Sequence, residues 1–134
     1  EELAGKLAGK KVTLLGLAFK PGTDDMREAA SIRVINVLRK RGVVNIVGYD
    51  PKALKTAEEE LGNKIKYANS IEEALKDSDC ALLITEWDDF AALTPNDFKK
   101  HMKSPNLVDG RRIYDYEIFD KALPFRAIGR INLN

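Results

Sequence analysis

Short apolar runs that alternate with helical patterns restrict the fold of this chain more than any other feature of its sequence. The runs are rich in valine, leucine and isoleucine and lack regular polar alternation, so both faces of the resulting sheet are expected to be covered. Strands are predicted at residues 11–17, 44–49, 80–85 and 105–109, with weaker ones at 64–67 and 126–129.

Helical spacing of apolar residues fills the segments between these runs. Helices are predicted at residues 29–41, 52–61 and about 115–122. Gly42 and Gly62 stand where helices usually stop. Ser70 opens a stretch with the spacing of a capping box, and Thr94 with Pro95 combines an N-cap with proline at the first helical position.

Strand–helix alternation implies parallel strands joined by right-handed crossovers. We therefore predict an α/β fold, a Rossmann-like three-layer domain. It would contain a mainly parallel sheet of about five to six strands with helices on both faces. The length of 134 residues suits one domain. We assign it to residues 10–134 and treat residues 1–9 as the end of a preceding segment or a linker.

Composition argues against several classes of function. The net charge of +1 gives no sign of the basic surface that binds nucleic acid or a membrane. No apolar run approaches the length that is needed to span a membrane. A single cysteine rules out an internal disulfide, which fits a cytoplasmic protein. No cysteine–histidine cluster suggests a metal site, and the glycine fingerprints that hold a dinucleotide or a triphosphate are missing.

Polar and aromatic residues follow four of the predicted strands. Because ligands of open parallel sheets bind beyond the carboxyl ends of the strands, these residues define a candidate site. Basic side chains among them suit an anionic ligand, and arginine suits phosphate in particular. The residues at this edge are Phe19, Lys20 and Arg27 after the first strand, Asp50 after the second, Thr85, Glu86, Trp87 and Asp88 after the fourth, and Asp109, Arg111 and Arg112 after the fifth.

Each of these residues also has a purely structural interpretation. Asp50 and Asp88 fit solvated loop positions as well as ligand contacts, and Trp87 fits a packing role better than a ligand platform. Cys80 opens an apolar strand, as a small buried hydrophobe would. The other residues with such an interpretation are Asp24 and Asp25, which could cap the next helix, and His101, which is expected at an exposed helix end.

Four blocks carry a more specific signal. They read GLAFKPGTDDMREAAS, GYDP, ALLITEWDDF and LVDGRRIYD, in this order. Together they resemble the C-terminal domain of the UDP-glucose/GDP-mannose dehydrogenase family over about residues 9–130, and the TEWDDF block is most like the UDP-glucose branch.

This resemblance implies an NAD-dependent enzyme that oxidises the primary alcohol of a nucleotide-bound sugar to a carboxylate in two steps. In such enzymes an N-terminal Rossmann domain holds NAD, and a central helix mediates the formation of a homodimer. A catalytic cysteine precedes the C-terminal domain. Cys80 does not match the motif of that cysteine. The chain is therefore expected to contain no catalytic residue and no metal site, and to be inactive without the N-terminal domain.

The resemblance also assigns individual residues. Phe19, Lys20 and Arg111 match positions that contact the UDP-sugar, and Arg27 matches an arginine that reaches NAD across the domain cleft. Gly110 would allow the backbone to turn close to the ligand. Arg112 receives no role.

Two alternatives stay open. One is an enzyme of the same family that acts on GDP-mannose or on a UDP-N-acetylhexosamine. The other is a nucleotide-binding module without catalytic activity.

Overall fold

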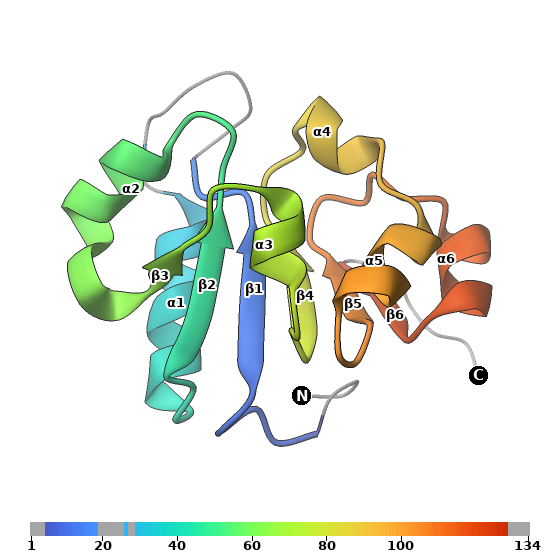
Figure 1. Cartoon of the computed structure of the whole chain (residues 1–134), viewed down its shortest axis with the longest axis horizontal. Coiled ribbons are helices and arrows are strands. Elements are labelled where there is room, and N and C mark those ends of the chain that lie inside the picture. The colour runs from blue at the N-terminus through green and yellow to red at the C-terminus, as the bar shows by residue number, and fades with distance from the viewer. Residues whose placement is uncertain (1–4, 19–25, 27–28, 129–134) are drawn as a thin grey trace.

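A parallel sheet organises the computed structural model of this chain, which describes residues 5–18, 26 and 29–128 (Figure 1). Six strands in the order β3-β2-β1-β4-β5-β6 make up this sheet within the described residues, and every neighbouring pair is parallel. The predicted Rossmann-like class is confirmed. The strands are β1 (Lys11–Leu15), β2 (Asn45–Tyr49), β3 (Lys66–Tyr67), β4 (Cys80–Leu83), β5 (Asn106–Asp109) and β6 (Phe125–Ala127).

The two central strands end two residues earlier than the sequence pattern predicts. Gly16 adopts φ +99°, which turns the chain out of the extended conformation directly after β1. Beyond β4, the N–H groups of Ile84 and Thr85 both donate to the carbonyl of Leu15, at 2.9 and 3.4 Å. The two strand ends therefore stay bonded to each other, although regular pairing stops there.

Helices fill the predicted segments between the strands. They are α1 (Ala30–Lys40), α2 (Leu54–Leu61), α3 (Ile71–Leu75), α4 (Asp88–Ala91), α5 (Pro95–His101) and α6 (Tyr116–Ala122), with the 3₁₀ turn η1 (Gly62–Lys64). The sequence analysis did not predict α4. The predicted caps are present: Ser70 Oγ accepts the N–H of Glu73 at 3.0 Å, and the N–H of Thr94 donates to Asp97 Oδ2 at 2.7 Å.

Successive residues of β1 and β2 pack into two different apolar clusters, one on each face of the sheet. Val12, Leu14 and Ile46 share one cluster with side chains of α1 and α2. Leu15 and Val47 belong to the other, which contains side chains of α3, α5 and α6. Figure 1 shows the same three layers. The prediction that both faces are covered is thus confirmed for β1 and β2.

The strand order reverses between β1 and β4. From β1 the chain proceeds through β2 to β3 at one edge of the sheet, and after the crossover it proceeds from β4 through β5 to β6 at the other. Such a reversal separates the loops that leave the two central strands and opens a crevice at their carboxyl ends. The loops that follow β1, β4 and β5 therefore define where a ligand is expected.

Candidate functional site

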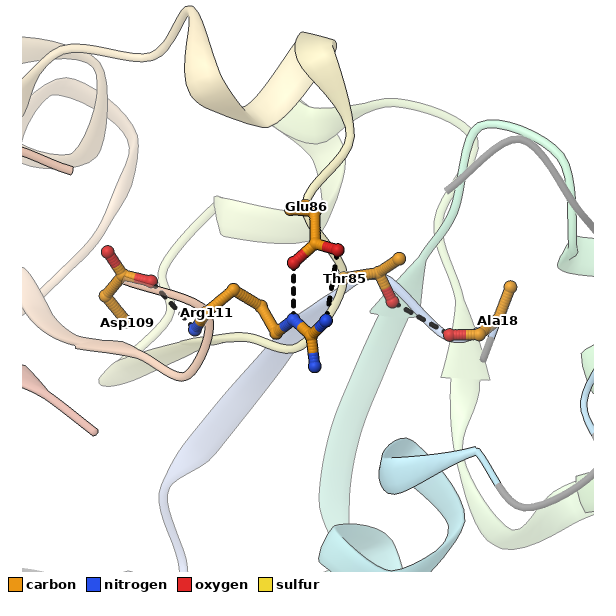
Figure 2. Close-up of polar contacts among 5 residues, drawn as sticks. All are labelled: Ala18, Thr85, Glu86, Asp109 and Arg111. Carbon is orange, nitrogen blue, oxygen red and sulfur yellow. Dashed lines mark hydrogen bonds and ion pairs between the residues drawn. The ribbon is translucent and has the colours of Figure 1, made fainter. Parts of the chain in front are cut away.

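Glu86 and Arg111 form a bidentate ion pair at the carboxyl ends of β4 and β5. Leu83 and Asp109 are directly paired in the sheet, and Glu86 and Arg111 follow them by three and two residues. Arg111 Nε lies 2.5 Å from Glu86 Oε2, and Nη2 lies 3.0 Å from Oε1 (Figure 2). The two side chains are 41% and 36% exposed for Arg111 and Glu86 respectively. The predicted phosphate-binding arginine therefore lies at the expected edge, already paired with a carboxylate.

Both members of this pair, Glu86 and Arg111, are charged. The hydrogen bond from Arg111 lowers the pKa of Glu86, and the same bond raises the pKa of Arg111. Since both groups are substantially exposed, solvent screens their attraction and the pair adds little to folding stability. Its main consequence is geometric: it determines the direction in which the guanidinium points.

Asp109 shapes the loop that carries Arg111. Its side chain is fully buried; Oδ1 accepts the N–H of Arg111 at 3.0 Å and Oδ2 accepts the N–H of Tyr114 at 2.9 Å. Gly110 lies against β4, where an added Cβ would be only 2.6 Å from the carbonyl oxygen of Leu83. Gly110 is therefore needed for close packing of this loop on the neighbouring strand, whereas the predicted approach of its backbone to a ligand stays a prediction.

Asp50 is neither a solvated loop residue nor a free ligand contact. Its side chain is 1% exposed, and four backbone N–H groups donate to it. Oδ2 accepts those of Leu17 and Ala18 at 2.8 and 3.0 Å, while Oδ1 accepts those of Lys52 and Ala53 at 2.9 and 2.8 Å. The bonds to Lys52 and Ala53 organise the turn before α2, which explains why that helix begins later than predicted.

Two further buried hydroxyl groups fasten the segment after β1. Ser31 Oγ donates to the carbonyl of Leu17 at 2.6 Å, and Thr85 Oγ1 donates to the carbonyl of Ala18 at 2.9 Å (Figure 2). Sequence reasoning missed both roles, because a serine within an expected helix and a threonine at a strand end carry no local signal for a partner so distant along the chain.

Three of the four predicted site residues, Phe19, Lys20 and Arg27, lie outside the described residues, as do Asp24 and Asp25. What the structure describes is the anchor of that loop. The N–H groups of Leu17 and Ala18 donate to Asp50, which follows β2. Their carbonyl groups accept the hydroxyls of Ser31 in α1 and of Thr85 after β4, respectively. The segment that leads into Phe19 and Lys20 is thereby tied to the carboxyl ends of β2 and β4.

The remaining candidates take structural roles. Trp87 is half-buried against the cluster of α3, α5 and α6, and Asp88 is exposed in the first turn of α4. Burial raises the pKa of the Cys80 thiol to about 11, which fits the predicted small hydrophobe. His101 ends α5 as predicted, but it is half-buried because the α5 end packs on the turn at Asp77, whose N–H donates to the His101 carbonyl.

A small apolar cavity adjoins Arg111. It has a volume of about 230 Å³ and lies between α1 and the face of β4 and β5. Pockets that enclose a whole ligand are usually larger, roughly 300–1,000 Å³. This cavity is therefore too small to enclose a nucleotide sugar. Its lining consists of Ala30, Val34, Leu82, Leu83, Ile84, Val108, Gly110, Arg111 and Ile128.

Comparison with known proteins identifies the family. Residues 13–116 match the family model described as "UDP-glucose/GDP-mannose dehydrogenase family, UDP binding domain". The chain belongs to this family. The UDP-glucose 6-dehydrogenase of Haloferax volcanii is 47% identical over 107 residues, which are 80% of this chain and 24% of the relative. That of Rhizobium meliloti is 39% identical over 127 residues, which are 94% of this chain and 29% of the relative.

Solved structures of the dehydrogenase family share the fold. A UDP-glucose dehydrogenase from Pyrobaculum islandicum superposes with a TM-score of 0.78 at 30% identity, over 94% of this chain and 27% of that one. A UDP-D-ManNAc dehydrogenase from Pyrococcus horikoshii gives a TM-score of 0.75 at 25% identity, over 93% and 27%. This chain thus spans about a quarter of the length of the relatives it matches. Within its described residues, none of the helices is both long and apolar enough to cross a bilayer.

The described residues do not fit NAD at this domain's own switch point. In dinucleotide-binding Rossmann domains a glycine-rich turn after the first strand approaches the pyrophosphate, and an acidic side chain further along the chain accepts the ribose hydroxyl. Here Leu17 and Ala18 follow Gly16, and Asp50 at the end of β2 is saturated by backbone N–H groups. The strand order of that fold is present. The glycine fingerprint is missing, however, and the carboxylate at the end of β2 is already bonded to the protein's own backbone.

Proposed function

We propose that this chain is the nucleotide-sugar-binding C-terminal domain of an NAD-dependent dehydrogenase that oxidises UDP-glucose to UDP-glucuronate in two steps. In this proposal the chain contributes substrate binding, while the catalytic cysteine and most of the NAD site belong to an N-terminal domain of the same enzyme, which forms a homodimer. The proposal rests on the family membership and on relatives that are UDP-glucose 6-dehydrogenases.

The single structural observation that supports it best is the position of Arg111. Its guanidinium lies beyond the carboxyl end of β5, with Nη1 directed away from Glu86 (Figure 2). A guanidinium offers paired N–H donors at the spacing of two phosphate oxygens. Arg111 would therefore bind the diphosphate of the nucleotide sugar.

The predicted loop residues complete the proposed site. Phe19 and Lys20 would contact the sugar nucleotide, and the ammonium of Lys20 would supply three donors to diphosphate oxygens and sugar hydroxyls. Arg27 would reach the NAD that the N-terminal domain holds. NAD, when bound, accepts the hydride in each oxidation step.

Calorimetric titration of this chain with UDP, UDP-glucose, GDP-mannose and NAD tests the proposal. We expect UDP and UDP-glucose to bind, and Arg111→Ala to weaken their binding at least about tenfold, as for loss of a charge-assisted bidentate contact. Arg112→Asn is the matched control. Arg112 is the adjacent exposed arginine and has φ +58°, a conformation that asparagine tolerates.

The outcomes separate the alternatives. Binding of UDP that is lost in Arg111→Ala and kept in Arg112→Asn supports the proposed site. A preference for GDP-mannose would keep the family and change the substrate. Equal loss in both variants would mean that the general positive charge matters and that Arg111 has no specific role, which would contradict the assignment.

A further inference from the structure

The ion pair between Glu86 and Arg111 engages only one edge of the guanidinium. Nε and Nη2 donate to the two carboxylate oxygens of Glu86. Nη1 has no partner among the residues that the structure describes, and Figure 2 shows it pointing away from the carboxylate. A guanidinium carries five N–H donors, so three remain after this pairing. The edge formed by Nη1 and Nη2 is therefore still able to bind an anion.

The backbones on both sides of the pair are held firmly. Thr85, directly before Glu86, is buried and bonded through its hydroxyl to the carbonyl of Ala18. The N–H of Arg111 donates to the buried carboxylate of Asp109, and Gly110 is packed on the carbonyl of Leu83. The exposed Arg111 side chain can still rotate, and its bidentate contact with Glu86 restricts that rotation.

We propose that Glu86 is a positioning residue, which orients Arg111 so that its free guanidinium edge faces the diphosphate of the bound nucleotide sugar. The inference rests on the proposed function for the identity of the ligand, but the orientation itself rests on the contacts of Glu86 and Arg111. Ordering a long side chain before the ligand arrives lowers the entropy that binding costs. Glu86 acts through Arg111 and has no contact with the reacting atoms.

A different role for the Glu86 carboxylate predicts the opposite change in anion affinity. If Glu86 were a counter-ion that the ligand had to displace, its removal would strengthen anion binding. Long-range repulsion between the carboxylate and a diphosphate acts in that direction as well, although solvent and salt screen it at an exposed site. A double-mutant cycle separates these effects, because repulsion persists without Arg111 whereas positioning does not.

The experiment compares wild type, Glu86→Gln, Arg111→Ala and the double variant by calorimetric titration with inorganic pyrophosphate and with UDP-glucose. Glutamine keeps the length of the side chain and removes its charge. We expect Glu86→Gln to weaken binding of both ligands about three- to tenfold when Arg111 is present, the range expected for one side chain that must be ordered on binding. In the Arg111→Ala background, the same substitution should cause no loss.

Asp88→Asn is the matched control, since it removes another exposed carboxylate from the same loop region without touching Arg111. It should leave both affinities within about twofold, as for a screened surface charge. Melting temperatures of all variants should stay close to wild type because the pair is exposed. The Nε–H resonance of Arg111 in nitrogen-edited NMR spectra should shift in Glu86→Gln, which reports the loss of the charged hydrogen bond without any ligand.

Tighter binding in Glu86→Gln would overturn the positioning role and identify Glu86 as a competing counter-ion. Equal losses in both backgrounds, or no Arg111-dependent binding of pyrophosphate, would also overturn it. Failure of the proposed function looks different: pyrophosphate would show the coupling between Glu86 and Arg111, whereas UDP-glucose would bind no better than pyrophosphate.

Discussion

The carboxylate of Asp50 holds the backbone of Leu17, whose N–H donates to Oδ2 at 2.8 Å. This bond ties the end of β2 to the end of β1 across 33 residues of sequence. Dinucleotide-binding Rossmann domains offer an acidic side chain to the ribose of the cofactor. In this chain the carboxylate at the end of β2 binds the protein's own backbone, so it anchors the start of a loop.

Replacement of Asp50 by asparagine should destabilise the fold markedly. One of the two oxygens becomes an NH₂ group that faces backbone donors, so two buried N–H groups lose their acceptor. We expect the free energy of unfolding to fall by about 2–4 kcal/mol, measured by urea denaturation. Asp88→Asn, at the exposed aspartate that the sequence could not distinguish from Asp50, should change it by less than about 0.5 kcal/mol. Similar values for the two variants would disprove the anchoring role.

Gly16 should tolerate no side chain. Its φ of +99° is strained for other residues, and a Cβ there would lie 2.5 Å from the Cβ and 2.6 Å from the backbone nitrogen of Thr85. Gly16→Ala combines strain with a backbone clash and should cost more than about 3 kcal/mol of stability. Gly9→Ala isolates the strain, because Gly9 has φ +81° and open space around it, and should cost about 1–2 kcal/mol. Thermal unfolding of both variants gives the comparison, and equal losses would exclude the clash with Thr85.

Trp87 should act by packing alone. Its indole Nε1 is buried and has no hydrogen-bond partner among the described residues, so Trp87→Phe removes no such bond. We expect this variant to lose less than about 1.5 kcal/mol of stability and to bind UDP as wild type does. Since Trp87 is the single tryptophan, its fluorescence should also stay unchanged during the UDP titration. Strong quenching, or weaker UDP binding by the variant, would instead make Trp87 part of the ligand site.

Cys80 should be unreactive in the folded protein. Desolvation raises the pKa of its thiol from the usual value near 9 to about 11. Because the thiolate is the reactive form, alkylation by iodoacetamide near pH 8 should be roughly a hundredfold slower than in urea-unfolded chain. The rate in folded protein should continue to rise toward pH 11, whereas that of the unfolded chain should level off above pH 9. Equal rates at pH 8 would contradict the burial of this thiol.

Local patterns were sufficient to predict most of the elements and the class of the fold. The apolar runs predicted every strand that lies within the described residues, and glycine, proline and capping residues placed the predicted helix ends within a few residues. Boundaries failed where the backbone leaves the regular pattern. Strand β1 stops before Gly16, whose φ of +99° turns the chain and lets it lie close to Thr85. Helix α2 starts late because Asp50 binds the N–H groups before it. The helix α4 was missed because four residues are too short for a periodic signal.

By itself, the sequence determined the α/β class and the family. It also determined that Arg111 lies at the edge of the sheet formed by the carboxyl ends of the strands. These follow from periodicity and from motifs, which are properties of neighbouring residues. Only the tertiary structure decided that backbone N–H groups occupy the carboxylate of Asp50. It also decided that Glu86, in the loop after β4, pairs with Arg111 in the loop after β5. The physical reason is that hydrogen bonds and ion pairs depend on distances of about 3 Å. For residues 25 to 33 positions apart, sheet register sets those distances.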